Sequence, residues 1–186
     1  MDRALLINGL TFLLVDLFIY WRLSDPRSKD EKIKYYFSKT GILIGLFGFA
    51  YLLLNYISGM YFPLPYSGFD ELLTLAGLWI FLIGAAIAIW AKITMGKYWN
   101  PPVSHDHKRQ IKLMKHGPFK YSRNPIYLGI IMVLAGYGIA LQSYFTFLAI
   151  VPIYYFYSSV LKEEKNLEKV FKEEYLKYKK EVPRFF

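Results

Sequence analysis

Apolar residues fall into long blocks separated by polar segments, and the blocks contain few or no charges. Crossing the hydrocarbon core of a bilayer takes about 20 residues, so such blocks predict membrane-spanning helices. The last block has 36 residues and no charge, which is too long for one span. Gln142 and Ser143 near its middle predict a turn that divides it into a helical hairpin. The predicted spans cover residues 4–21, 41–58, 72–95, 126–141 and 144–161.

A charged segment with a helical repeat follows the last span. In residues 162–182, Leu167, Phe171 and Tyr175 recur at helical spacing, while Lys and Glu fill the other positions. We therefore expect an all-α integral membrane protein with five transmembrane helices, the last two a hairpin, and a C-terminal amphipathic helix. The chain is expected to form one domain. It has three N-terminal spans within residues 1–95, and a polar loop, two spans and the tail helix within residues 96–186.

The distribution of charge predicts the orientation. Of 23 Lys and Arg residues, 22 lie in segments 22–40, 92–123 and 162–184, which five spans would place on one side. The positive-inside rule then puts the N-terminus outside and the C-terminus in the cytoplasm. The net charge of +9 is concentrated beside apolar blocks, which indicates contact with membrane lipid and not with nucleic acid. The oligomeric state is left open.

Residues 115–129 contain the densest group of candidate site residues. Gly117-Pro118 and Asn124-Pro125 interrupt the backbone, and Pro125 suits the first turn of a helix. The segment is predicted to be an ordered, non-helical loop that leads into a membrane helix. Non-helical backbone beside hydrocarbon persists only where protein or a ligand satisfies its polar groups. The alternative interpretation is a plain connecting loop.

Other chemistry-bearing residues lie outside or at the edge of the spans. Glu163 and Glu164 border the apolar stripe of the tail, where two carboxylates would suit a ligand's ammonium and ribose hydroxyls. The alternative is that they solvate a helix exit. His116 could donate to a ligand, act as a base near neutral pH, or be structural. No metal site is predicted, because the histidines of segment 105–107 lack recognisable further ligands and the chain has no cysteine.

A series of short motifs completes this pattern. They are Gly-Pro-Phe at 117–119, Tyr121, Arg-Asn-Pro-Ile-Tyr-Leu-Gly at 123–129, Glu-Glu-Lys-Asn-Leu at 163–167 and Val-Pro-Arg-Phe at 182–185. In order and spacing they resemble the isoprenylcysteine carboxyl methyltransferase and phospholipid methyltransferase family of integral membrane enzymes. The resemblance covers about residues 108–186. Asn124 stands where the family usually has His, and Lys172 where a Gly commonly follows the tail phenylalanine.

The resemblance implies S-adenosyl-L-methionine bound at the cytoplasmic face. It also implies a lipophilic methyl acceptor, such as an isoprenylcysteine carboxylate or a lipid amine, that enters from the membrane. The candidate catalytic residues are Arg123 and Arg184, which would orient a carboxylate, and Glu164, which would serve as base for an amine. The candidate cofactor-binding residues are Lys115, His116, Gly117, Pro118, Phe119, Tyr121, Asn124, Pro125, Tyr127, Leu128, Gly129, Glu163 and Glu164.

Two other functions remain open at this stage. Membrane sterol reductases share a similar C-terminal half and use a nicotinamide cofactor, although they are usually longer. A non-catalytic lipid-binding scaffold is the other alternative, because Asn124 departs from the family pattern. Binding of a methyl donor, of a nicotinamide nucleotide or of neither distinguishes the three.

Overall fold

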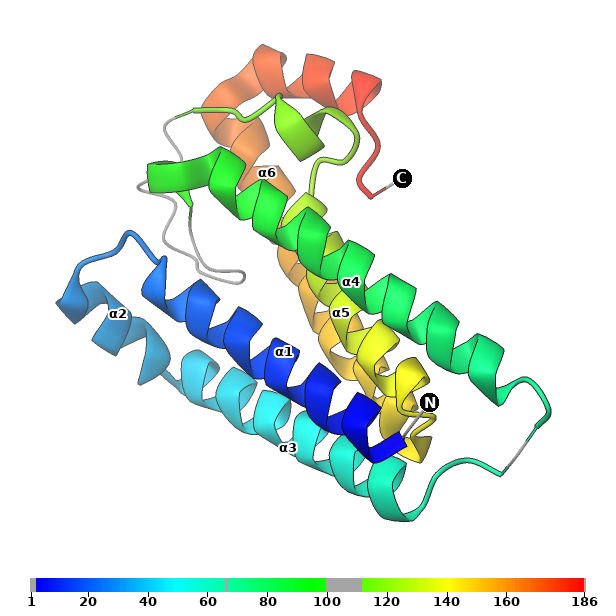
Figure 1. Ribbon diagram of the computed structural model, residues 1–186. Coiled ribbons are helices and arrows are strands. Elements are labelled where there is room, and N and C mark those ends of the chain that lie inside the picture. The colour runs from blue at the N-terminus through cyan, green and yellow to red at the C-terminus, as the bar shows by residue number, and fades with distance from the viewer. Residues whose placement is uncertain (1–2, 66, 100–111, 186) are drawn as a thin grey trace. The chain divides into compact units, whose positions relative to one another are not determined.

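The computed structural model describes residues 3–65, 67–99 and 112–185, which form helices joined by turns and loops and contain no strand. The all-α prediction is therefore confirmed for this part of the chain (Figure 1). The α-helices are α1 (Arg3–Leu23), α2 (Lys29–Tyr36), α3 (Lys39–Tyr61), α4 (Asp70–Met95), α5 (Pro125–Ala140) and α6 (Ile150–Glu181). Short 3-10 helices are η1 (Gly96–Tyr98), η3 (Gly117–Lys120) and η4 (Tyr144–Ala149).

Among the described residues, four helices are long and apolar enough to cross a membrane. They cover Ala4–Leu23, Gly41–Tyr61, Asp70–Tyr98 and Tyr144–Glu181. The protein is thus an integral membrane protein. The helix predicted as a fourth span is apolar but has only 16 residues, fewer than the about 20 that a crossing takes. Helix length therefore leaves the count of five spans a prediction.

The chain forms two compact units, residues 1–81 with 134–149, and residues 82–133 with 150–186. Helices α4 and α5 contribute to both. The prediction of a single domain is not tested by this division, and each unit is described by itself.

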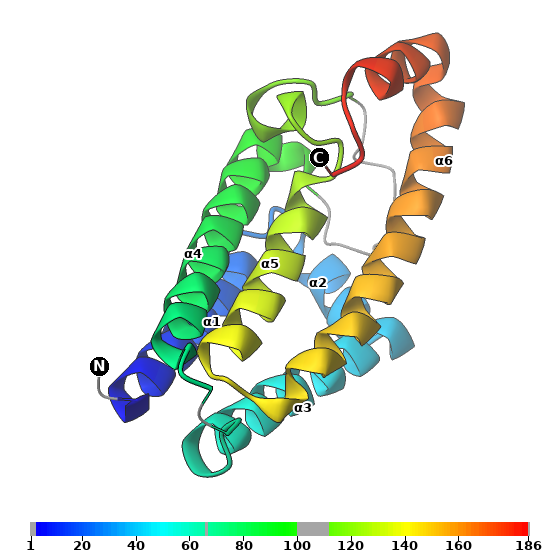
Figure 2. The same ribbon diagram turned by 90° about the vertical axis from the view of Figure 1, so that its right-hand side faces the viewer.

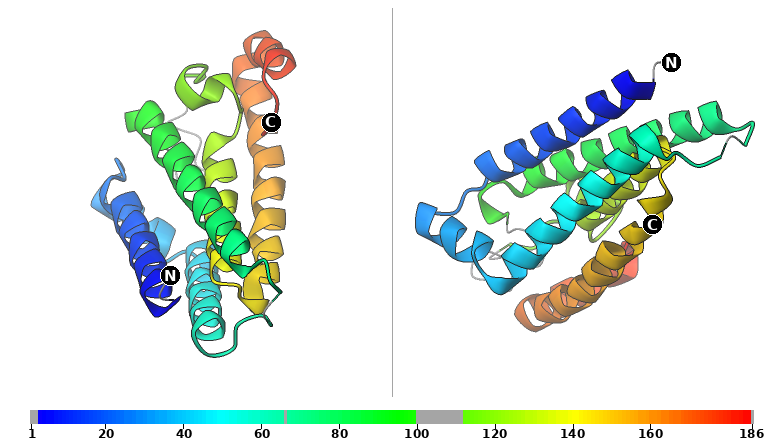
Figure 3. Two further views of the ribbon diagram at one scale, coloured as in Figure 1. Left: turned by 45° about the vertical axis from the view of Figure 1, so that its right-hand side comes forward. Right: turned by 90° about the horizontal axis from the view of Figure 1, so that it is seen from below.

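In the first unit, α1 and α3 lie side by side and α2 connects them (Figures 1 and 3). Polar side chains hold helix backbones together inside apolar surroundings. The Tyr51 hydroxyl donates to the Leu134 carbonyl oxygen at 2.7 Å, and the hydroxyls of Thr11 and Tyr137 are 2.9 Å apart. The predicted turn is present, because Gln142 takes a left-handed backbone conformation with φ 51°. Its side-chain amide donates to the Asp70 carbonyl oxygen at 2.7 Å, which holds the turn against the start of α4.

The chain departs from the predicted elements at α6, whose residues belong to the second unit. The predicted span begins at Tyr144, but Tyr144–Ala149 forms a 3-10 helix and α6 starts at Ile150. Pro152 explains this start, because a proline is tolerated in the first turn of an α-helix and disrupts its interior. Helix α6 then continues past the apolar block to Lys172, where a kink with φ 45° and ψ −123° redirects it. After the kink the chain turns back toward the start of α5 (Figure 2).

Candidate functional site

The segment before α5 is held by backbone and side-chain contacts. Gly117 has φ 59°, and a Cβ atom there would lie 2.8 Å from Thr94 Oγ1, so the position suits glycine alone. Residues Gly117–Lys120 form one 3-10 turn, which corrects the prediction of a wholly non-helical loop. Pro118 sits at the beginning of this turn, where its missing N–H costs no hydrogen bond. Helix α5 begins at Pro125, as predicted.

Arg123 joins this loop to the end of the chain. Its backbone N–H donates to the Pro183 carbonyl oxygen at 3.0 Å. Its guanidinium Nη1 donates to the carbonyl oxygens of Lys179 at 2.9 Å and Val182 at 2.8 Å. These two carbonyls lie at the C-terminal end of α6, where helix carbonyls lack partners within the helix. Arg123 therefore caps α6 from another segment of the chain.

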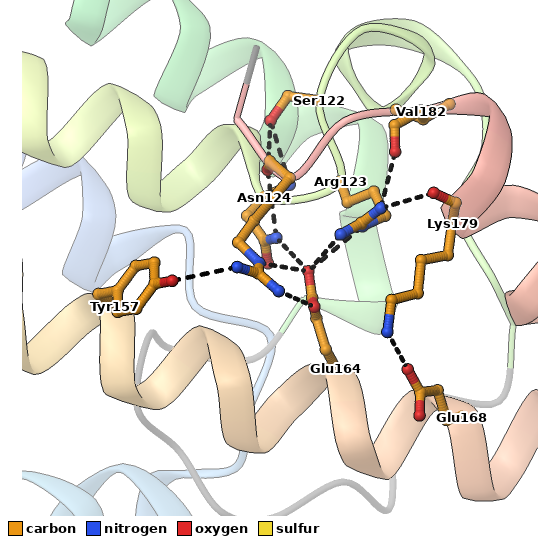
Figure 4. A network of polar contacts seen from close by, with 9 residues as sticks. Ser122, Arg123, Asn124, Tyr157, Glu164, Glu168, Lys179 and Val182 are labelled. Carbon is orange, nitrogen blue, oxygen red and sulfur yellow. Dashed lines mark hydrogen bonds and ion pairs between the residues drawn. The ribbon is translucent and has the colours of Figure 1, made fainter.

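The other side of the same guanidinium contacts Glu164, whose side chain is only 4% exposed. Arg123 Nη2 lies 3.0 Å from Glu164 Oε1, and Arg184 Nη2 lies 2.9 Å from Oε2 (Figure 4). Asn124 Nδ2 also donates to Oε1 at 3.3 Å. A buried carboxylate is stable only when paired and hydrogen-bonded, and here two arginines and an amide satisfy it. We call Arg123, Asn124, Glu164 and Arg184 the Glu164 cluster.

Electrostatics keep Glu164 ionised. Burial by itself raises the pKa of this carboxyl, but the hydrogen bonds and positive charges of Arg184 and Arg123 outweigh it. The pKa of Glu164 consequently lies below its ordinary value. The hydrogen bond to Glu164 in turn raises the pKa of Arg184. The cluster carries two positive charges and one negative charge, and its carboxylate is a weak base.

Glu163 has different surroundings from Glu164, although the two are adjacent. The Tyr127 hydroxyl donates to Glu163 Oε2 at 3.0 Å, and Glu163 is partly exposed. Tyr127 itself is 6% exposed and its ring packs against Phe156 of α6. Of the two carboxylates, only Glu163 remains accessible to a ligand that approaches from solvent.

The predicted cofactor-binding residues divide into buried and exposed groups. Pro118, Phe119, Asn124, Pro125, Tyr127, Gly129 and Glu164 are buried, Gly117, Leu128 and Glu163 are partly buried, and Lys115, His116 and Tyr121 are exposed. Lys115 forms an ion pair with Glu174 at 2.8 Å between two exposed side chains. The structure thus brings the polar members of the loop and tail together, while His116 and Tyr121 face outward. Segment 105–107 lies outside the described residues, among which no group of three or more His, Asp or Glu could hold a metal.

Sequence reasoning missed several residues of this site. Ser122 Oγ donates to the Arg184 carbonyl oxygen at 3.1 Å and accepts from the Asn124 N–H at 3.2 Å. The Tyr178 hydroxyl donates to the Phe119 carbonyl oxygen at 2.6 Å. Arg184 Nη1 donates to the Tyr157 hydroxyl at 3.2 Å. The position of Ser122 inside the motif was a usable signal, whereas Tyr157 is one of 17 tyrosines and nothing nearby marked it.

Comparison with known proteins identifies the family of this chain. The model of the phospholipid methyltransferase family matches residues 72–174, which is more than half of the chain. The chain belongs to this family. The match includes the loop and both glutamates, while Arg184 lies beyond it. The family expected from the sequence motifs is therefore confirmed.

A solved structure agrees at the level of the fold. This chain superposes on the structure of the eukaryotic intramembrane Ras methyltransferase, isoprenylcysteine carboxyl methyltransferase, with a TM-score of 0.70. The two sequences are 20% identical. The likeness covers 98% of this chain and 66% of that one, so the chain spans less than two thirds of that protein's length. No curated protein matches the sequence.

Proposed function

We propose that the protein transfers a methyl group from S-adenosyl-L-methionine to a lipophilic acceptor that reaches the site from the membrane. One observation carries this proposal. The Arg-Asn-Pro, Glu-Glu and Val-Pro-Arg motifs, which are far apart in the sequence, meet in the Glu164 cluster. Family membership supports the reaction class, and the apolar helices support an acceptor drawn from the bilayer.

The residues around the cluster fit this cofactor. S-adenosyl-L-methionine supplies, when bound, a methyl group on a positively charged sulfonium, which is an already activated donor. Glu163 would hold the cofactor's ammonium or ribose hydroxyls. Tyr121 is 68% exposed and Trp90 48%, and aromatic faces stack on purines and attract cations. Gly117 lets the loop pack directly against Thr94, close to Trp90, because a side chain at this position would collide with Thr94.

The charge of the cluster favours a carboxylate over an amine as acceptor. Arg184 retains 30% exposure of its side chain and could orient a carboxylate, whereas the Arg123 side chain is 7% exposed and already caps α6. A carboxylate oxygen forms its bond to the methyl carbon as the carbon–sulfur bond breaks, and no proton is released. An amine acceptor must lose a proton, and Glu164, with its lowered pKa, is poorly suited to take it. His116 is the exposed alternative base for an amine.

The protein's contribution to such a reaction is alignment and exclusion of water. Methyl transfer from a sulfonium is an in-line displacement, so fixed positions of donor and acceptor account for much of the acceleration. The Glu164 cluster supplies this rigidity, because it ties the loop, α6 and the chain end together. Two other functions, a nicotinamide-dependent reductase and a non-catalytic lipid-binding scaffold, are distinguished from methyl transfer by the titration described next.

Calorimetric titration of the detergent-purified protein with S-adenosylhomocysteine, with NADPH as a parallel ligand, tests this function. We expect micromolar binding of S-adenosylhomocysteine, weakened at least tenfold by Glu163→Gln. Glu173→Gln, an exposed carboxylate further along α6, is the matched control and should bind as the wild type does. Binding of NADPH alone would identify a reductase. Binding of neither by folded protein would favour the non-catalytic scaffold.

A further inference from the structure

The connection between α1 and α3 lies outside the segment matched by the family model, and it is built as a rigid unit. Asp25 and Arg27 form a buried ion pair at 2.6 Å, and the Arg27 guanidinium lies 4.5 Å from the centre of the Tyr35 ring. Ser28 and Glu31 form a reciprocal capping box, in which the Ser28 N–H donates to Glu31 Oε2 at 2.9 Å. Helix α2 therefore has a defined orientation relative to the ends of α1 and α3.

One face of α2 combines lysines with exposed apolar side chains. Lys29, Lys32, Ile33 and Phe37 follow one another at spacings of three, one and four residues, which place them on the same side of a helix. Ile33 is 47% exposed and Phe37 74% exposed. We call these four residues the basic–apolar face. Solvated helices expose polar residues, so this combination requires an amphipathic partner.

The charges on α2 are unequally distributed between its faces. Asp30 and Lys34 directly follow Lys29 and Ile33, so each points about 100° away from its neighbour around the helix, and among the described residues they form no ion pair with each other. Glu31 is engaged by Ser28. Among the described residues, neither Lys29 nor Lys32 forms an ion pair. The basic–apolar face consequently has unbalanced positive charge beside apolar side chains.

We propose that the basic–apolar face of α2 binds the headgroup region of an anionic phospholipid leaflet. Helices α1 and α3 are both long and apolar enough to cross the bilayer, so the helix that joins their ends lies at a membrane surface (Figure 1). Interfacial helices bury an apolar face at the headgroup boundary and direct lysines to anionic lipid phosphates. Ile33 and Phe37 would enter this boundary, and Lys29 and Lys32 would contact the phosphates. This inference does not depend on the proposed methyl transfer.

The absence of cysteine from the sequence allows a direct test of depth. Nitroxide labels on Ile33→Cys and, as the matched control, Lys34→Cys would be compared in nanodiscs that contain phosphatidylglycerol and phosphatidylcholine. We expect the label at 33 to be relaxed by oxygen and protected from a water-soluble nickel complex, and the label at 34 to show the reverse. Equal exposure of both labels to the nickel complex would overturn the proposal. Protection of the label at 33 from both reagents would also overturn it, because a protein partner or second copy would then cover the face.

A second measurement tests the charge. Spin-labelled phosphatidylglycerol and phosphatidylcholine report how strongly each lipid associates with the protein. The Lys29→Gln/Lys32→Gln variant should lower the preference for phosphatidylglycerol by about twofold or more, while Lys34→Gln should leave it close to wild type. An unchanged preference in the double variant would contradict a role for this face in anionic lipid binding.

Discussion

Glu164 is the residue on which the candidate site is built, because its two oxygens receive donors from three residues in two other segments of the chain. Removing one partner of a buried ion pair leaves the opposite charge without compensation, which costs more than the pair itself contributes. Asn124 takes part in this arrangement through its amide and also donates to the Arg184 carbonyl oxygen at 3.3 Å. The residue that departs from the family pattern therefore serves as a hydrogen-bond donor in the cluster.

Glu164→Gln should destabilise the folded tail by about 1.5–3 kcal/mol, the range for hydrogen bonds to charged groups. The substitution keeps the shape of the side chain but removes the charge that both arginines face. Glu168→Gln is the control, since its ion pair with Lys179 is partly exposed and such pairs contribute about 0–1 kcal/mol. Thermal unfolding in detergent would measure both. Equal shifts of the unfolding midpoint in the two variants would show that Glu164 contributes no more to stability than a partly exposed ion pair does.

Lys172 adopts a conformation that costs energy for any residue with a side chain. Its φ of 45° with ψ −123° lies in a region that glycine enters readily. Lys172→Gly should therefore stabilise the kink by about 1–2 kcal/mol. Lys169→Gly, at an exposed helical position before the kink, should destabilise by about 1 kcal/mol. The two glycines should thus shift thermal unfolding in opposite directions, and a loss of stability in both would show that the kink is not strained.

At the scale of elements, α4 and α5 touch through glycines in the second unit. A Cβ atom on Gly129 would lie 2.6 Å from the Gly84 carbonyl oxygen and 2.8 Å from Ala88 Cβ. Small residues let membrane helices approach closely enough for backbone contact, which is a main source of their attraction. This contact positions the start of α5, from which Asn124 and Tyr127 reach α6.

Gly129→Ala should separate α4 from α5 and destabilise the protein by about 1–3 kcal/mol, as overpacked cores do. Gly45→Ala in α3 is a suitable comparison, because nothing lies within 4 Å of the added methyl group. The comparison variant should be neutral or slightly more stable, since alanine favours helix more than glycine does. The midpoint of thermal unfolding in detergent distinguishes them. A harmless Gly129→Ala would mean that the helices can move apart without cost.

Acidification should release the end of α6 from the loop. The folded pKa of Glu164 is lowered, so its contribution to stability is complete above the unfolded pKa of about 4.5 and is lost as pH falls through the lower folded value. A nitroxide on Glu181→Cys, which is exposed at the helix end, would report increased mobility in this acidic range. The same label combined with Glu164→Gln should lack this acid transition. A transition of equal size in both would assign it to other carboxyls.

At the scale of the whole molecule, the asymmetry of Lys and Arg remains the basis for orientation. The segment between α3 and α4 is predicted to lie outside the cell, and the end of α6 in the cytoplasm. Single-cysteine variants Ser67→Cys and Glu181→Cys test this with a membrane-impermeant maleimide. We expect Ser67→Cys to react in intact cells and Glu181→Cys only after lysis. The opposite result would reverse the topology and place the candidate site on the other face.

The sequence by itself determined the apolar helices, the helix start at Pro125, the turn at Gln142 and the order of the family motifs. These features depend on the composition and spacing of residues close together in the chain, so local physics is enough to predict them. The kink at Lys172 and the 3-10 turn Gly117–Lys120 escaped prediction, because neighbouring segments impose both.

Only the tertiary structure decided how the site is divided. The sequence presented Glu163 and Glu164 as an equivalent pair. In the structure Glu164 receives Arg123 from 41 residues away and Arg184 from 20, while Glu163 receives Tyr127. Which of two adjacent carboxylates becomes buried depends on the direction in which α6 faces the loop, and that direction follows from packing between distant segments. The sequence was therefore enough to identify the residues that carry the chemistry, but only the tertiary structure shows which of them pair with one another.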